Sequence, residues 1–322
     1  MASTEMAADA SVKPSRGARG RRWYGFVIKL AVGLAVLGFL IWHYDLRSTF
    51  RVIGRERPVF FIATVMLFVA GQAMSAYRWQ LLARLVGLAG SYVEFLSFYF
   101  IGMFTNVFVP GLIGGDALRA VYLGRSRGRI TDAVASVVAD RGIGLIALFW
   151  LAGGSALTIT RVALPPTLRD ATIATGAAAL IAFLAAPLAA KMTDRLPRPL
   201  ARLLSPLLPY MKRPGALGPA IILSLLLQIS LAGCQYLLAL GLGLDVPLTT
   251  FILIVPISNV AASLPLTING LGVREAAYLV LLGMTGVSKN NSVALSLLYF
   301  AATLAGGLTG LVPFIATAMP GE

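Results

Sequence analysis

The sequence predicts an all-α membrane protein, a polytopic helix bundle, from two observations. First, 58% of the 322 residues are hydrophobic and 12% are charged, whereas soluble domains carry about 25% charged residues. Second, the apolar residues form blocks of roughly 20 residues, the length that a helix needs to cross the hydrocarbon core of a bilayer. Alternating strands of about ten residues, which build membrane β-barrels, are absent from the sequence.

The chain divides into a short tail and one membrane domain. Residues 1–22 are rich in alanine, serine, glycine and arginine, which predicts a disordered basic tail. Residues 23–322 are expected to form a single integral membrane domain. Its first apolar run, 23–42, is long and lacks a small-residue cleavage site, so we expect an uncleaved membrane helix rather than a signal peptide.

Further apolar blocks are expected to form helices in order along the chain. Arg78 lies between Tyr77 and Trp79, which suits an anchor at the level of the lipid headgroups. The basic link 191–217 predicts a cytoplasmic loop with an amphipathic segment on the membrane surface. The expected blocks cover residues 58–76, 92–110, 132–152, 171–190, 218–243, 248–264 and 291–317, with shorter runs at 114–124 and up to 284.

Two of the apolar runs end in breaks of similar composition. Irregular backbone at bilayer depth is tolerated only where protein or water shelters it. Paired breaks in the two halves of a chain are a sequence signature of a transporter binding site. The first break contains Asn106, Pro110, Gly114, Gly115, Asp116 and Arg119, and the second contains Asn259, Pro265, Asn269, Gly270, Gly272, Arg274 and Glu275.

Three predicted crossings separate the two breaks. If each break enters and leaves on one side, the odd number of crossings places the two broken, re-entrant helix pairs on opposite faces, as inverted repeats. Most basic residues, with Arg78 and Arg119 counted among them, then share the side of the N-terminal tail, which predicts a cytoplasmic N-terminus. The arginines of residues 46–57 run against this rule. In the alternative, both breaks cross the membrane completely, and the loops in the middle of the chain then lie on the other side of the membrane.

Asp116 and Arg119 are the first candidates for site chemistry. They lie three residues apart and share a face of a helix. One interpretation is a structural ion pair. In the other, Arg119 and the glycine N–H groups bind an anion such as a lipid phosphate, while Asp116 positions the arginine or takes up a proton. The same two interpretations apply to Arg274 and Glu275.

Asp140 and Arg141 lie inside an apolar block, where ionisable residues usually face a protein interior or a cavity. They are therefore a third candidate for the lining of the site. Asn106 and Asn259 are expected either to cap broken helix ends or to contact the ligand.

The sequence argues against several other classes of protein. Its single cysteine, Cys234, and single histidine, His43, give no basis for a zinc site or a catalytic triad. Nucleotide-binding glycine loops are absent, so we expect neither an ATP-driven pump nor a cofactor. The net charge of +14 comes from basic loops between apolar blocks, which favours anionic lipid headgroups over nucleic acid as a partner.

Four motifs together resemble the lysylphosphatidylglycerol synthase transmembrane-region family, also called the flippase-like domain family. They are Tyr77-Arg78-Trp79, NVFVPGLIGGDALR (106–119), ASVVADRGIGL (135–145) and SLPLTINGLGVREAA (263–277). In larger relatives this region moves an aminoacylated phospholipid made by a C-terminal synthase domain. The chain resembles a stand-alone member without that domain, so the resemblance implies no phosphatidylglycerol lysyltransferase activity. The resemblance marks as site residues Arg78, Asn106, Pro110, Gly114, Gly115, Asp116, Arg119, Asp140, Arg141, Asn269, Gly270, Arg274 and Glu275.

Three functions are compatible with these features. The favoured one is a translocase that moves an anionic phospholipid or a polyprenyl-phosphate-linked lipid across the bacterial inner membrane. The second is a membrane enzyme of lipid-linked glycan or aminoacyl-lipid synthesis, with Asp116, Asp140 or Glu275 as acid or base. The third is a membrane scaffold for a partner protein that carries the lipid-synthesis activity.

Overall fold

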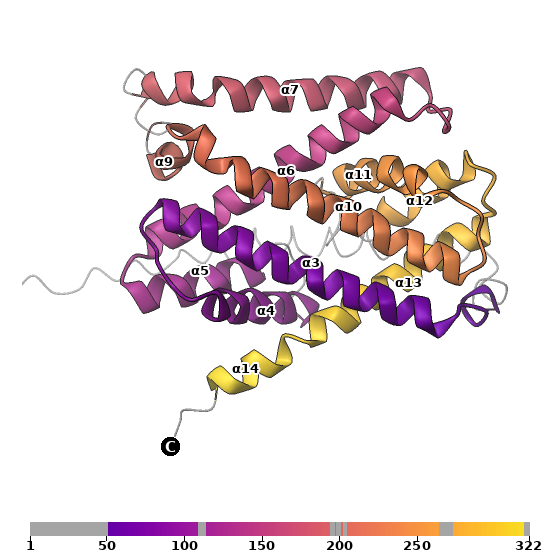
Figure 1. The fold of residues 1–322 in the computed structure, drawn as a ribbon, viewed down its shortest axis with the longest axis horizontal. Coiled ribbons are helices and arrows are strands. Elements are labelled where there is room, and N and C mark those ends of the chain that lie inside the picture. The colour runs from indigo at the N-terminus through magenta and orange to yellow at the C-terminus, as the bar shows by residue number, and fades with distance from the viewer. Residues whose placement is uncertain are drawn as a thin grey trace, which may run out of the picture.

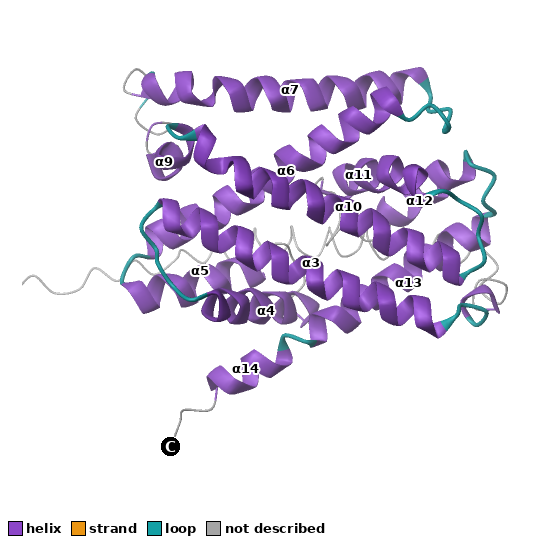
Figure 2. Cartoon of the chain, in the orientation of Figure 1, coloured by secondary structure: helices purple, strands orange, loops and turns teal. Residues whose placement is uncertain are grey.

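The computed structural model describes residues 51–108, 114–193, 197, 201, 205–263 and 273–318. Within these residues every regular element is a helix and none is a strand (Figure 2), which confirms the predicted all-α bundle. The basic tail 1–22 and the predicted first membrane helix 23–42 lie outside the described residues.

Five of the described helices are long and apolar enough to cross a membrane by their length and composition. The helix at one edge of the bundle, α7, exposes 67% of Ile181 and of Leu184, as expected where side chains meet lipid tails of equal polarity. The long helices are α3 (Pro58–Leu85), α6 (Ile130–Thr158), α7 (Pro166–Lys191), α10 (Gly218–Gly241) and α13 (Lys289–Leu308) (Figure 1).

The first break forms a hairpin of two shorter helices, α4 (Tyr92–Phe108) and α5 (Gly114–Arg127). Arg127, in the last turn of α5, donates to Glu94 in the first turn of α4 at 2.6 Å and to the Ala89 carbonyl at 2.9 Å. The start of α4 and the end of α5 therefore lie together at one end of the bundle. This hairpin is compatible with a re-entrant pair, and its entry into the membrane from one side stays a prediction.

The second pair, α11 (Leu248–Ser263) and α12 (Val273–Gly283), lies toward the other end of the bundle (Figure 1). The Arg57 N–H donates to the Gly241 carbonyl at 3.2 Å, so α3 begins where α10 ends. Because α4 follows the end of α3 and α11 follows the end of α10, the two pairs begin at opposite ends of the bundle. A symmetry that relates the pairs, the predicted inverted repeat, stays a prediction.

The predicted final helix 291–317 is wrong as a single element. Helix α13 ends at Leu308, and α14 (Leu311–Ala318) begins after a turn of two residues (Figure 1). Pro313, in the first turn of α14, has no N–H with which to continue the hydrogen bonds of α13. Gly310 lies against the Phe100 carbonyl of α4, closer than a residue with a Cβ could approach.

The link 191–217 also differs from its prediction, because its described residues form no continuous amphipathic helix. They form short turns, η2 (Ser205–Leu207), α9 (Leu208–Met211) and η3 (Pro214–Leu217), since prolines interrupt the helical hydrogen bonds. Tyr210 and Leu217 are buried, and Tyr210 donates its hydroxyl to the Leu82 carbonyl at 3.1 Å. The segment therefore packs into the bundle and contacts α6 and α7.

Candidate functional site

A cluster of charged side chains lies where α3, α5 and α6 meet, and its base is fully buried. Arg78 donates from Nε to Asp140 Oδ1 at 2.7 Å, and Arg119 donates from Nη2 to Asp140 Oδ2 at 2.9 Å. Arg78 also donates from Nη1 to Ser224 Oγ at 2.8 Å. One carboxylate thus joins arginines from two helices. The predicted headgroup anchor at Arg78 is wrong, because this side chain points into the bundle, where Asp140 neutralises it.

Asp116 forms the outer half of the same cluster. It accepts from Arg119 Nε at 3.1 Å, as the spacing of three residues predicts. It also accepts two hydrogen bonds from Arg141, from Nε at 2.6 Å and from Nη2 at 2.9 Å. The exposed fraction of the side chain rises from 2% at Arg119 through 17% at Asp116 to 49% at Arg141. The cluster therefore runs from a closed base to an accessible mouth.

Two aromatic rings fix the guanidinium of Arg119. Its Cζ lies 4.8 Å from the centroid of the Trp79 ring and 4.9 Å from that of Tyr99, which is cation–π geometry on both rings. Trp79 is itself held by a hydrogen bond from Nε1 to Ser136 Oγ at 3.0 Å. The arginine is therefore preorganised before any ligand arrives.

The cluster carries more positive than negative charge. Arg78, Arg119 and Arg141 face two carboxylates, Asp116 and Asp140, which leaves one positive charge without a counter-ion among these residues. The buried Nη1 atom of Arg119 has no hydrogen-bond partner among the described residues. A buried donor without a partner is costly, and the cluster keeps one net positive charge, so the arrangement favours a bound anion.

A polar cavity of about 100 Å³ lies beside Arg119. Its volume corresponds to roughly three water molecules, which also suits a small tetrahedral group. It is lined by Gln72, Tyr99, Gly102, Met103, Asn106, Gly115, Asp116, Arg119 and Arg141.

Glycine and asparagine allow α5 to start against α4 beside this cavity. A Cβ on Gly102 would lie 2.7 Å from the Gly115 carbonyl oxygen, so the two backbones can meet only without side chains. Asn106 Oδ1 accepts from the Gly115 N–H at 2.8 Å, which is a cap on the new helix. This N–H therefore has a partner in the protein, and binding of an anion by the glycine N–H groups stays a prediction. Gly114 begins α5 and does not line the cavity.

The remaining predicted site residues belong to the second break. Asn259 lies in α11 and is half-buried. Pro110, Asn269 and Gly270 lie outside the described residues, as do the side chains of Arg274 and Glu275, whose backbone forms the first turn of α12. A ligand role for any of these residues stays a prediction.

Two contributors to the site were missed by the sequence reasoning. Tyr99 stacks on Arg119, and it gave no signal because aromatic residues are common in apolar blocks. Gln72 lines the cavity and could have been found, since an amide within a predicted membrane helix requires a polar partner.

Comparison with known proteins identifies the family of the chain. The family model described as the lysylphosphatidylglycerol synthase TM region matches residues 26–310. The chain belongs to this family. The matched residues include the whole charged cluster, so the four motifs that suggested the resemblance identified the family correctly.

Two archaeal relatives, each named a UPF0104 membrane protein, are similar to this family member. The protein from Methanothermobacter thermautotrophicus is 25% identical over 299 residues, which cover 83% of this chain and 88% of the relative. The protein from Pyrococcus horikoshii is 24% identical over 120 residues, and this alignment spans only 36% of each chain. Their names record a membrane location and no activity.

Proposed function

We propose that this protein is a flippase-like translocase for lipids with a net negative charge whose headgroup contains one phosphodiester. One observation supports it most directly, the unpartnered Nη1 of buried Arg119 beside a small polar cavity in the membrane-spanning bundle. Family membership agrees with a lipid-handling membrane domain. Anionic phospholipids and polyprenyl-phosphate-linked lipids both meet this chemical description.

The charge balance favours a monoanion as the group that enters the cavity. A phosphodiester carries one negative charge, which would compensate the one uncompensated arginine. Its oxygens can accept the directed N–H groups of a guanidinium. A diphosphate would bring additional negative charge and bulk into a cavity of about 100 Å³.

Arg141 and Asp116 form the entrance to this site. Arg141 is the most exposed arginine of the cluster, so it would meet the phosphate first and exchange its bonds to Asp116 for bonds to the ligand. Asp116 would keep its bond to Arg119. The lipid tails would stay in the bilayer while the headgroup passes the hairpin.

We place the α4–α5 end on the cytoplasmic side of the membrane, with the N-terminus. Arg125, Arg127 and Arg129 lie at this end, in agreement with the positive-inside rule. Arg78 and Arg119 no longer support that orientation, because they are buried. The sequence has no nucleotide-binding loop, so we expect transport that ATP hydrolysis in this chain does not drive, with a lipid-synthesis enzyme as a partner.

The test is lipid movement in proteoliposomes. Fluorescent phosphatidylglycerol is followed from one leaflet to the other for the wild type, Arg119→Gln and Arg141→Gln. Loss of a phosphate contact is expected to slow transport by about ten-fold or more, whereas Arg125→Gln, an exposed change on α5, should leave the rate unchanged. Fluorescent phosphatidylcholine should move more slowly, because its choline cation is repelled by the cluster.

Folding is checked by size-exclusion chromatography and circular dichroism. The Arg141→Gln variant covers the case in which Arg119→Gln does not fold, since Arg141 is partly exposed. Wild-type transport rates in folded Arg141→Gln and Arg119→Gln proteins would refute the proposed site.

A further inference from the structure

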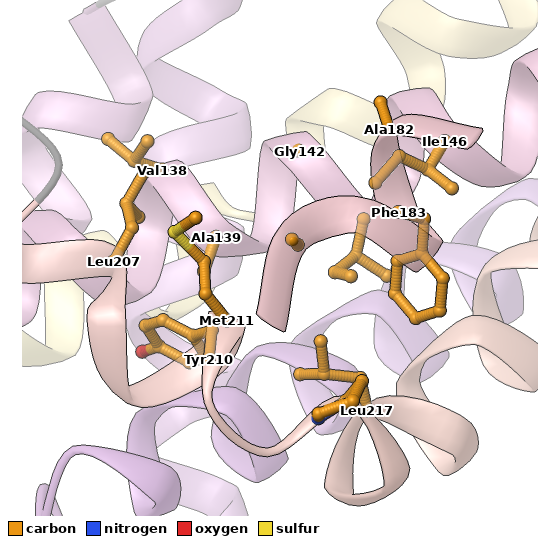
Figure 3. Close-up of a pocket in the computed structure, with 13 residues that line it drawn as sticks. Val138, Ala139, Gly142, Ile146, Ala182, Phe183, Leu207, Tyr210, Met211 and Leu217 are labelled. Atoms are coloured by element: carbon orange, nitrogen blue, oxygen red, sulfur yellow. The ribbon is translucent and has the colours of Figure 1, made fainter. Parts of the chain in front are cut away.

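A second cavity lies on the other side of α6 and is almost wholly apolar. It has a volume of about 260 Å³ and lies between α6, α7 and the short turns that precede α10. Figure 3 shows its side chains converging from these elements, with Phe183 on one side and Tyr210 and Met211 on the other. We call this cavity the α6–α7 groove.

The groove is open because small residues line part of it. A Cβ built on Gly142 would meet no atom within 4 Å, and Ala139, Ala182 and Ala186 are among its other lining residues. Its volume is slightly below the roughly 300 Å³ at which pockets for drug-sized molecules begin. Part of a single hydrocarbon chain fits such a space, whereas a helix about 10 Å across does not.

The rim of the groove is basic. Lys212 and Arg213 are exposed, and they stand in sequence between Met211 and Pro214, which both line the groove. Neither cation forms an ion pair with a described residue. The nearby Tyr210 hydroxyl already donates to the Leu82 carbonyl, and burial raises its pKa well above the usual range, so it adds no negative charge to the rim.

We propose that the α6–α7 groove binds one acyl chain of an anionic phospholipid, whose phosphate contacts Lys212 and Arg213. An apolar channel beneath exposed cations matches the two parts of such a lipid, because basic residues at the membrane surface attract anionic headgroups. A zwitterionic lipid gains less from the same rim. The site lies on the face of α6 opposite the charged cluster and does not depend on the proposed transport function.

Native mass spectrometry tests this binding site. The purified protein is exchanged into nanodiscs of phosphatidylglycerol and phosphatidylcholine in equal parts, and the retained lipid is measured after release. The wild type should retain about one phosphatidylglycerol in preference to phosphatidylcholine. The double change Lys212→Gln and Arg213→Gln should weaken that retention by roughly ten- to thirty-fold, since each surface cation contributes on the order of a ten-fold or smaller factor.

A steric variant tests the acyl chain separately from the headgroup. Gly142→Leu places a branched side chain into the groove from a position where an added Cβ meets no atom within 4 Å, and it should lower the retention of both lipids. Matched controls are Gly283→Leu, at an exposed glycine of α12 whose added Cβ also meets no atom within 4 Å, and the double change Arg51→Gln and Arg55→Gln, which removes two exposed cations before α3. Unchanged retention in both groove variants, or no preference for phosphatidylglycerol in the wild type, would overturn the proposal.

A photo-crosslinker identifies the occupant directly. Benzoylphenylalanine replaces Ala182, an exposed residue that lines the groove, and the protein is irradiated in a phosphatidylglycerol membrane. An added mass of one phospholipid supports the proposal. A crosslink to a peptide of residues 23–42, or to a second copy of the chain, would show that protein covers the groove and would refute it.

Discussion

The two faces of α6 differ in how they are closed. On one face, Asp140 and Arg141 form four hydrogen bonds with side chains of α3 and α5. On the other face, Ala139, Gly142 and Ile143 line an open apolar groove. Neighbouring residues of α6 thus form a hydrogen-bonded polar site on one face and line an open apolar groove on the other.

The difference follows from the solvent around each face. A bilayer offers no hydrogen bonds, so charged groups at this depth must be satisfied within the protein. Apolar groups lose little by facing lipid tails, which are as apolar as the side chains themselves. The charged face is therefore closed by the fold, whereas the apolar face can be left for the membrane to fill.

The largest loss of stability is expected when Asp140, at the buried base of the charged cluster, is neutralised. Asp140→Asn removes the carboxylate shared by Arg78 and Arg119 and leaves two buried cations unpaired. Breaking a buried ion pair costs about 3–5 kcal/mol, so the folded protein should be strongly depleted. Thermal unfolding in lipid nanodiscs and the yield of monodisperse protein measure this loss.

Asp132→Asn is the matched control for that change. Asp132 lies on the same helix and pairs with Arg129 at 2.7 Å, but both side chains are exposed. Its loss should cost less than about 1 kcal/mol. Equal stability of the Asp140→Asn and Asp132→Asn proteins would show that the buried network does not hold the helices together.

A smaller loss is expected where the hairpin closes over the charged face. In Gly115→Ala the new methyl group would meet the Gly102 carbonyl oxygen and lie 2.7 Å from Asn106 Nδ2. Forcing α4 and α5 apart should destabilise the protein by about 1–3 kcal/mol, measured as a lower midpoint of thermal unfolding. Gly154→Ala, at an open position of α6, should not lower the midpoint. A wild-type midpoint for Gly115→Ala would contradict the close contact.

Loss of the helix cap should act locally. Asn106→Ala removes the side-chain oxygen that accepts from the Gly115 N–H. Loss of a capping side chain typically lowers stability by about 1 kcal/mol. Hydrogen–deuterium exchange should become faster in the first turn of α5 and stay unchanged in α10. Thr105→Ala is the neighbouring control, because the Thr105 hydroxyl donates only to the Ile101 carbonyl within α4. Equal exchange in both variants would rule out the cap.

The smallest effect is expected on the open face. Gly142→Ala adds a methyl group that meets no atom within 4 Å, and alanine favours a helix over glycine by up to about 1 kcal/mol. The unfolding midpoint should therefore stay equal or rise slightly, as for Gly154→Ala. A clear fall would mean that the groove is closed by another part of the protein, and the contrast between the two faces would fail.

Local patterns predicted most of the described helices. The apolar blocks marked α10 and α11 to within two residues at each end and α6 and α7 to within about six, because block length depends mainly on bilayer thickness. The spacing of Asp116 and Arg119 also predicted their ion pair, since residues three apart share a helix face. The final block failed because its apolar composition continues across Gly310 and Pro313, although the helix does not.

Long-range pairing could not be read from the same patterns. Arg78 was interpreted as an interfacial residue because a charge beside two aromatics normally ends an apolar block. In the structure α3 continues to Leu85, since Asp140, which lies 62 positions along the chain, neutralises the arginine. No local pattern states which buried acid meets which base.

The sequence by itself determined the class of this protein, its helical blocks, its family and the residue types of the candidate site. Tertiary structure alone decided that Arg78, Arg119 and Asp140 form one buried network and that Arg119 keeps an unpartnered donor. The physical reason is that membrane burial depends on local hydrophobicity, whereas compensation of a buried charge depends on contacts between distant helices.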